Sequence, residues 1–174
     1  MTKKKVKVGV VGCGVVATAY YLPYMMRMDT LDLVAVCDLY ETRTQACMRL
    51  FDAKEQYLDY YEMIDQADID AVFILTAPGT HVPFAKKAID AGKHLLIQKP
   101  MATNFEDAKT IARGIREANL KAIIEPSSNT PLDPDIALLR DLVRKGVLGQ
   151  ILWFSLAWTG PTTYGPALGG NPYG

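Results

Sequence analysis

Two glycines and an alanine follow the first apolar run of the chain at a spacing that suits phosphate binding. Val6–Val11 is rich in β-branched residues, and Gly12, Gly14 and Ala17 then complete the pattern G-x-G-x-x-A. Gly12 permits a tight turn, Gly14 removes the side chain that would keep a pyrophosphate from the backbone, and Ala17 lets the next helix pack closely. Because the N–H groups at the start of a helix attract phosphates, the pattern predicts a dinucleotide held by Gly12, Cys13, Gly14, Val15 and Val16.

A carboxylate follows the second apolar run. Asp38 comes directly after Leu31–Cys37, where a carboxylate can accept both hydroxyls of the adenosine ribose and repel a 2′-phosphate. This predicts NAD as the cofactor, with Leu39 beside the same ribose. Two alternatives stay open. Asp38 can instead cap a helix that begins near Glu41, and Arg43 can reach a 2′-phosphate and so keeps NADP as the less favoured choice.

A second group of residues follows two later apolar runs. In an open parallel sheet, ligands bind beyond the carboxyl ends of the strands, and six residues are expected there: Thr76, Ala77, Pro78, His81, Gln98 and Lys99. Lys99 precedes Pro100, which restricts the residue before it, and an amine held there can exchange protons with a substrate hydroxyl. An ordinary surface lysine is the alternative. For His81, a contact with the cofactor and a structural cap at a helix start are both open.

Apolar runs of strand length alternate with helical patterns along the first two thirds of the chain. This alternation predicts a doubly wound α/β fold, with a parallel sheet covered by helices on both faces. Gly92 and Asn119 stand where two helices need a left-handed last residue. We expect strands at 5–11, 32–37, 56–58, 70–76, 94–97 and 121–125, and helices at 15–28, 41–51, 59–66, 80–91 and 104–118.

The composition changes at Pro126, where a turn-rich stretch begins. An amphipathic helix is predicted at 135–145, followed by an apolar strand at 151–158 and a tail rich in glycine and proline. One strand and one helix cannot bury such an apolar face. We therefore expect residues 1–125 to form the dinucleotide-binding domain and residues 126–174 the incomplete start of a second domain.

The composition also argues against several classes of partner. Lys plus Arg and Asp plus Glu number 19 each, so no net charge favours nucleic acid or an anionic membrane. The three cysteines lack C-x-x-C spacing and the chain has two histidines, so no metal site is predicted. We expect a reducing, cytoplasmic location.

The N-terminus has a second interpretation. Three lysines followed by an apolar run that ends at Cys13 superficially resemble a lipoprotein signal peptide. Lys7, Gly9 and Gly12 interrupt that run, and Gly14 follows it, which disfavours this interpretation. No apolar run in the sequence reaches the ~18 residues that a membrane span needs.

Taken in order, these motifs resemble the Gfo/Idh/MocA family of NAD(P)-dependent oxidoreductases. The matching segments are G-C-G-V-V-A at 12–17, Asp38, T-A-P-G-T-H at 76–81, A-G-K-H-L-L-I-Q-K-P at 91–100 and P-x-x-x-x-L-R-x-L-V-x-x-G-x-L-G-x-I at 134–151. The resemblance implies a Rossmann domain, a sugar, cyclitol or related polyol as substrate, and Lys99 as the catalytic lysine between substrate and nicotinamide. It also implies a second α/β domain with a large open sheet, through which homo-oligomers form.

The chain departs from the family's pattern at three places. Gln98 replaces the glutamate that is usual before the lysine, and Pro131 stands where a basic residue commonly follows the asparagine matched by Asn129. The family's catalytic histidine lies beyond residue 174. Besides hydride transfer, two other functions therefore stay open: NAD-dependent glycoside hydrolysis on the same fold, and a non-catalytic dinucleotide sensor.

Overall fold

The computed structural model describes residues 4–125, 134–153 and 155. The chain divides into two compact units, Met1–Ser127 and Ser128–Gly174. Each unit is described below by itself.

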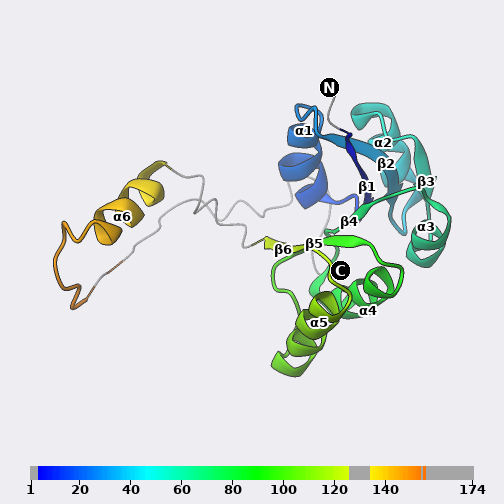
Figure 1. Ribbon diagram of the computed structural model, residues 1–174. Coiled ribbons are helices and arrows are strands. Elements are labelled where there is room, and N and C mark those ends of the chain that lie inside the picture. Colours follow the sequence, from blue (N-terminus) through cyan, green and yellow to red (C-terminus); the bar gives the residue numbers. More distant parts are fainter. Residues whose placement is uncertain (1–3, 126–133, 154, 156–174) are drawn as a thin grey trace. The chain divides into compact units, whose positions relative to one another are not determined.

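The first unit is built on one parallel sheet of six strands in the order β3-β2-β1-β4-β5-β6 (Figure 1). β1 and β4 are neighbours although two strands separate them in sequence, so the winding reverses direction between them. In a doubly wound sheet, ligands bind at this switch point. The predicted fold class is confirmed. The strands are β1 (Val6–Val11), β2 (Leu31–Cys37), β3 (Glu55–Tyr57), β4 (Ala71–Ile74), β5 (His94–Gln98) and β6 (Ala122–Glu125).

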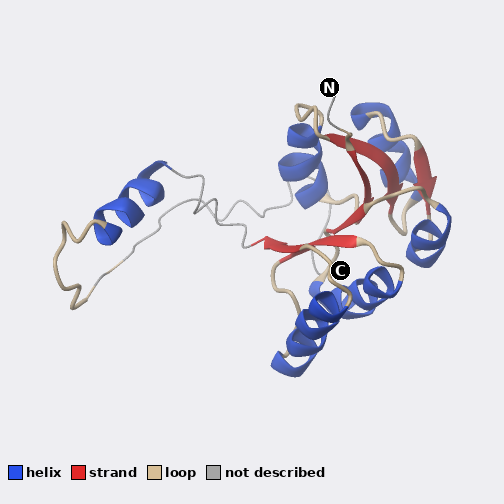
Figure 2. Ribbon diagram, viewed as in Figure 1, coloured by secondary structure: helices blue, strands red, loops and turns tan. Residues whose placement is uncertain are grey.

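Helices cover both faces of this sheet (Figure 2). On one face, α3, α4 and α5 bury side chains such as Met63, Ala85 and Ile111 against the strands. On the other face, the helix after β1 and α2 bury Leu22 and Cys47. The helices and the π-helical turn η1 are η1 (Ala17–Tyr21), α1 (Leu22–Met25), α2 (Glu41–Phe51), α3 (Tyr60–Gln66), α4 (Pro78–Asp90) and α5 (Phe105–Glu117).

The helix after the glycine turn differs from the prediction of 15–28. It begins at Val15, widens into the π-helical η1, and ends with α1 at Met25. The N–H of Leu22 bonds to the carbonyl of Ala17, five residues back. Pro23 follows within α1 and has no N–H to donate to an upstream carbonyl, and a wider turn before it relieves the clash of its ring.

Other helix ends agree with the sequence. Gly92 and Asn119 have φ of 67° and 52° and end α4 and α5 in the left-handed conformation, as predicted. Asp59 and Asn104 begin α3 and α5, and each side chain accepts hydrogen bonds from N–H groups of the first helical turn. These caps satisfy N–H groups that have no partner within the helix.

In the second unit, α6 (Pro134–Arg144) lies one residue from its predicted position of 135–145. The strand predicted at 151–158 is not formed in residues 151–153 and 155, and its other residues lie outside the described ones. Trp153 is exposed. An extended segment becomes a strand only with a ladder partner, and the described part of this unit contains no strand to pair with it. The segments of Asn129, Pro131 and Trp158 also lie outside the described residues.

Candidate functional site

The glycine turn after β1 lies at the switch point of the sheet. Gly12 has φ of 91°, and a Cβ at this position would lie 2.8 Å from the backbone C and O of Leu75. A Cβ at Gly14 would meet nothing within 4 Å. The fold itself therefore requires Gly12, whereas Gly14 leaves open space over the backbone, which is the space that a pyrophosphate needs.

The Asp38 side chain bonds to the backbone of this glycine turn. Its carboxylate accepts the Cys13 N–H at 2.8 Å through Oδ2 and the Tyr40 N–H at 3.0 Å through Oδ1, and the residue is 9% exposed. Tyr40, not Asp38, is the N-cap residue of α2. A carboxylate has about four acceptor positions, so each oxygen keeps one for a ligand. A single hydrogen bond thus joins the predicted phosphate-binding turn to the predicted ribose carboxylate.

Three side chains surround Asp38 at the edge of the sheet. The Arg43 guanidinium lies 3.8 Å from Asp38 Oδ1 and 4.6 Å from the centre of the Tyr40 ring. Leu39 is 86% exposed. Tyr40 is not among the residues predicted from the sequence. Its position three residues before Arg43, at the start of a helix, nevertheless indicates a cation–π contact.

The segment after β4 brings Thr76, Ala77 and Pro78 to the same edge. Thr76 accepts a hydrogen bond from the Thr80 hydroxyl at 2.7 Å, and Pro78 is the first residue of α4. His81, also on α4, is fully buried, and both of its ring nitrogens face backbone carbonyls. Of the two roles that the sequence left open for His81, this geometry favours the structural one.

The segment after β5 is held by Gln98. Its Oε1 accepts the Lys99 N–H at 2.7 Å, and its Nε2 donates to the Tyr21 hydroxyl at 3.2 Å. Burial and the negative charge of Glu125 raise the pKa of Tyr21 to about 12, so its phenol is neutral at physiological pH. Tyr21 is not among the residues predicted from the sequence. Its contact with Gln98 depends on the π-helical turn and joins segments that are far apart in sequence.

The Lys99 side chain is exposed, and its peptide bond to Pro100 is cis. The residue directly follows the last residue of β5, at the carboxyl edge where the sequence predicts it.

The three cysteines are buried. Burial and the neighbouring Asp38 carboxylate raise the pKa of Cys37 to about 12, so its thiol stays protonated. Within the described residues, no three His, Cys, Asp or Glu side chains group as a metal site requires. No described helix is long and apolar enough to cross a membrane.

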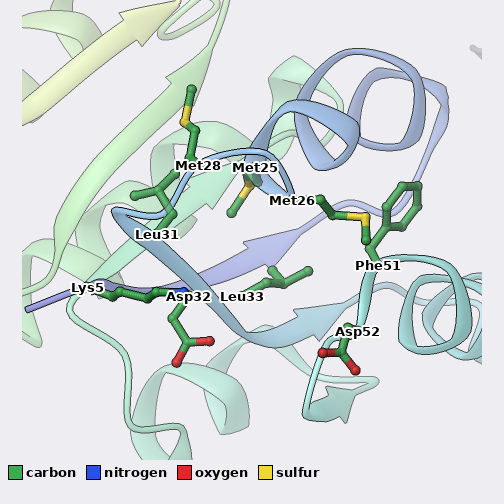
Figure 3. Close-up of a pocket in the computed structure, with 9 residues that line it drawn as sticks. All are labelled: Lys5, Met25, Met26, Met28, Leu31, Asp32, Leu33, Phe51 and Asp52. Atoms are coloured by element: carbon green, nitrogen blue, oxygen red, sulfur yellow. The ribbon is translucent and has the colours of Figure 1, made fainter. Parts of the chain in front are cut away.

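A hollow of about 160 Å³ lies at the opposite edge of the sheet, where β2 begins (Figure 3). It contains none of the predicted site residues. Six apolar residues, three of them methionines, and three charged residues line it: Lys5, Met25, Met26, Met28, Leu31, Asp32, Leu33, Phe51 and Asp52.

Comparisons with known proteins identify the family to which the chain belongs. The sequence profile of the Gfo/Idh/MocA proteins, described as an oxidoreductase family with an NAD-binding Rossmann fold, matches residues 6–125. The chain is 29% identical over 153 residues to dTDP-3,4-didehydro-2,6-dideoxy-alpha-D-glucose 3-reductase of Saccharopolyspora spinosa, covering 88% of this chain and 45% of that protein. It is 26% identical over 153 residues to scyllo-inositol 2-dehydrogenase (NADP(+)) of Bacillus subtilis, covering 88% of this chain and 41% of that protein.

Among solved structures, the scyllo-inositol dehydrogenase of Lactobacillus casei with bound NAD(H) and scyllo-inositol matches with a TM-score of 0.79. That match has 26% identity and covers 84% of this chain and 43% of the other. The chain thus spans less than half the length of each of these relatives.

Proposed function

Because the chain belongs to the Gfo/Idh/MocA family of oxidoreductases, we propose that its first unit binds a nicotinamide dinucleotide for hydride transfer to or from a sugar, cyclitol or related polyol. The observation that carries the proposal is the hydrogen bond from the Cys13 N–H to Asp38. It joins a backbone turn suited to a pyrophosphate to a carboxylate suited to a ribose. The open space over Gly14 supports the fit of such a ligand.

In this proposal the backbone from Gly12 to Val16 holds the pyrophosphate. Gly14 offers an approach free of side chains, and the first N–H groups of the following helix face the phosphates. Asp38 accepts the ribose hydroxyls through its remaining acceptor positions, and the exposed Leu39 provides apolar contact beside it. Further along the edge, Thr76, Ala77, Pro78 and Gln98 line the nicotinamide half.

Lys99 carries the proton chemistry in this proposal. Its ammonium follows β5 at the edge that the dinucleotide occupies, and it would give or take the proton of the substrate hydroxyl. A bound nicotinamide supplies the hydride chemistry. Residues 126–174 belong, in the same proposal, to the start of a second domain that holds the substrate and joins copies of the protein.

NAD is the proposed cofactor, in preference to NADP. A buried carboxylate at the ribose repels a 2′-phosphate, which favours NAD. The Arg43 guanidinium, 3.8 Å from that carboxylate, acts in the opposite direction because it offers a phosphate a cationic partner. The relative from Bacillus subtilis carries NADP in its name, so members of this family differ in this choice.

Isothermal titration calorimetry of the chain with NADH and NADPH tests both parts of the proposal. We expect NADH to bind at least about tenfold more tightly than NADPH, which corresponds to about 1.4 kcal/mol. Asp38→Ser should remove that preference, while Asp32→Asn, at the other end of β2, should leave it unchanged. If neither nucleotide binds the wild-type chain, the dinucleotide site is refuted, and if both bind equally, the role of Asp38 is refuted.

A dinucleotide sensor without catalysis is the second candidate. It is favoured by Gln98, whose amide is used within the fold and carries no charge to pair with Lys99. Lys99→Ala in a protein that contains the whole substrate domain separates the two functions. Loss of polyol oxidation with NADH binding retained supports the dehydrogenase, and unchanged activity supports the sensor.

A further inference from the structure

His81 has an unusual pair of hydrogen-bond partners. The ring is fully buried on the first turn of α4. Its Nδ1 lies 2.8 Å from the carbonyl oxygen of Pro100, and its Nε2 lies 2.9 Å from the carbonyl oxygen of Thr76. Both partners are backbone carbonyls, which accept hydrogen bonds and cannot donate them.

One ring is therefore in contact with two segments at once. Each nitrogen faces one carbonyl oxygen at hydrogen-bond distance. A buried polar side chain that meets the backbone at two places holds those places at a fixed separation.

We propose that His81 is a positioning residue, which ties the segment after β4 to the segment after β5. The two carbonyls that it joins belong to Thr76 and Pro100, each beyond the end of its strand. Pro100 directly follows Lys99. His81 therefore sets the separation of the two segments that line the nicotinamide half of the proposed site, and in this respect the inference rests on the proposed function.

The sheet itself does not provide this connection. β4 and β5 are paired from Ala71 and His94 up to Ile74 and Ile97. Thr76 and Pro100 lie past the last pair, where neighbouring strands diverge into separate loops. Pro100 has no N–H of its own, so its carbonyl is the backbone group through which the loop can be held at this residue. A side chain that contacts both loops supplies the connection that the strands lack here.

The other histidine of the chain provides an internal reference. His94 begins β5, at the opposite edge of the sheet, and its Nδ1 accepts a hydrogen bond from the Lys121 N–H at 3.3 Å. Among the described residues, His94 thus meets one backbone group, whereas the two nitrogens of His81 meet two.

Amide hydrogen exchange of the folded chain tests this connection without a cofactor. His81→Gln should free the segment after β5, so we expect about tenfold faster exchange at the amides of Lys99 and Met101, the scale of one lost hydrogen bond. His94→Gln, at the other edge, should leave these two amides unchanged. Unchanged exchange at Lys99 and Met101 in a folded His81→Gln overturns the proposal. This measurement needs no cofactor, so it stands even if the chain does not bind a dinucleotide.

The positioning role is tested by NADH titration of His81→Gln and His94→Gln. Glutamine carries both of its N–H donors on one nitrogen, so it cannot replace contacts made from two ring positions. We therefore expect His81→Gln to bind NADH about tenfold more weakly, the scale of one lost hydrogen bond. His94→Gln should bind as the wild type does. Unchanged NADH affinity of a folded His81→Gln overturns the positioning role.

Discussion

The two edges of the sheet use polar and charged side chains in different ways. At the carboxyl edge, Asp38, His81 and Gln98 are at most 9% exposed, and each hydrogen-bonds to backbone groups of the turns beyond the strands. At the amino edge, charged side chains pair with one another near the surface: Lys7 with Asp68 and Lys54 with Asp32. Buried polar groups that hold backbone are costly to disturb, whereas exposed ion pairs contribute ~0–1 kcal/mol.

The difference is one of burial. Backbone bonds hold loops at both edges, such as Gly12 N–H to Cys37 at the carboxyl edge and Asp70 N–H to Lys7 at the amino edge. Side chains add to them at both edges, but those named at the carboxyl edge are buried, whereas Asp70 and Lys93, which bond to backbone at the amino edge, are partly exposed. Pairs of substitutions, placed either at the two edges or at two positions of one edge, test this contrast.

The largest expected effect separates the two glycines of the carboxyl edge. Gly12→Ala forces an L-residue into φ of 91° and places its Cβ 2.8 Å from the Leu75 backbone. Strain of about 1–3 kcal/mol and a shift of the packed strand of about 1–3 kcal/mol should lower the free energy of unfolding by roughly 3 kcal/mol or more. Gly14→Ala meets no neighbour and should change stability by less than about 0.5 kcal/mol.

Urea unfolding of both variants, with NADH titration of Gly14→Ala, checks this prediction. We expect Gly14→Ala to stay as stable as the wild type and to lose affinity for NADH, because its methyl group occupies the approach of the pyrophosphate. Equal stability of Gly12→Ala and Gly14→Ala would contradict the assignment of Gly12 to the fold.

A smaller effect compares two carboxylates at the two ends of β2. Asp38→Ala leaves the buried Cys13 N–H without its partner, which should lower the free energy of unfolding by about 1–3 kcal/mol. Asp32→Ala breaks a pair in which Lys54 is more than half exposed, and should lower it by ~0–1 kcal/mol. Urea unfolding at two salt concentrations measures both, and only the effect of Asp32→Ala should shrink with salt. Similar losses for the two variants would remove the contrast between the edges.

The smallest effect concerns Tyr21 at high pH. Its pKa is raised to about 12 in the folded chain, first by burial and then by Glu125, against about 10 when unfolded. The stability that this difference contributes is present below pH 10 and is lost as the pH rises from about 10 to 12, because the unfolded chain loses the proton first. Tyr57, with a pKa of about 12, acts in the same direction.

Tyr21→Phe should therefore reduce, without abolishing, the fall in the free energy of unfolding between pH 10 and 12. Urea unfolding at intervals across that range is the measurement. Tyr20→Phe, which removes an exposed phenol from the same turn, is the control. An unchanged pH dependence in Tyr21→Phe would mean that the phenol is not buried against Gln98 and Glu125.

Much of the fold could be predicted from local signals. Apolar runs located most strands of the first unit, and Gly92 and Asn119 marked two helix ends through conformations that few other residues adopt. The prediction failed for residues 151–153 and 155, which have the composition of a strand but form none, because a strand needs a partner. The helix after Gly14 ends three residues before its predicted end, where Arg27 and Met28 make turn bonds to carbonyls three residues back.

For the candidate site, the sequence alone determined which residues follow the strand ends: the glycine turn, Asp38, Thr76 and Lys99. That is a consequence of chain order, since parallel strands bring their carboxyl ends to one edge. Only the tertiary structure decided what those residues touch. Asp38 turns onto Cys13, Gln98 reaches Tyr21 and His81 lies buried between two carbonyls, because such contacts join segments far apart in sequence and depend on how strands and helices pack.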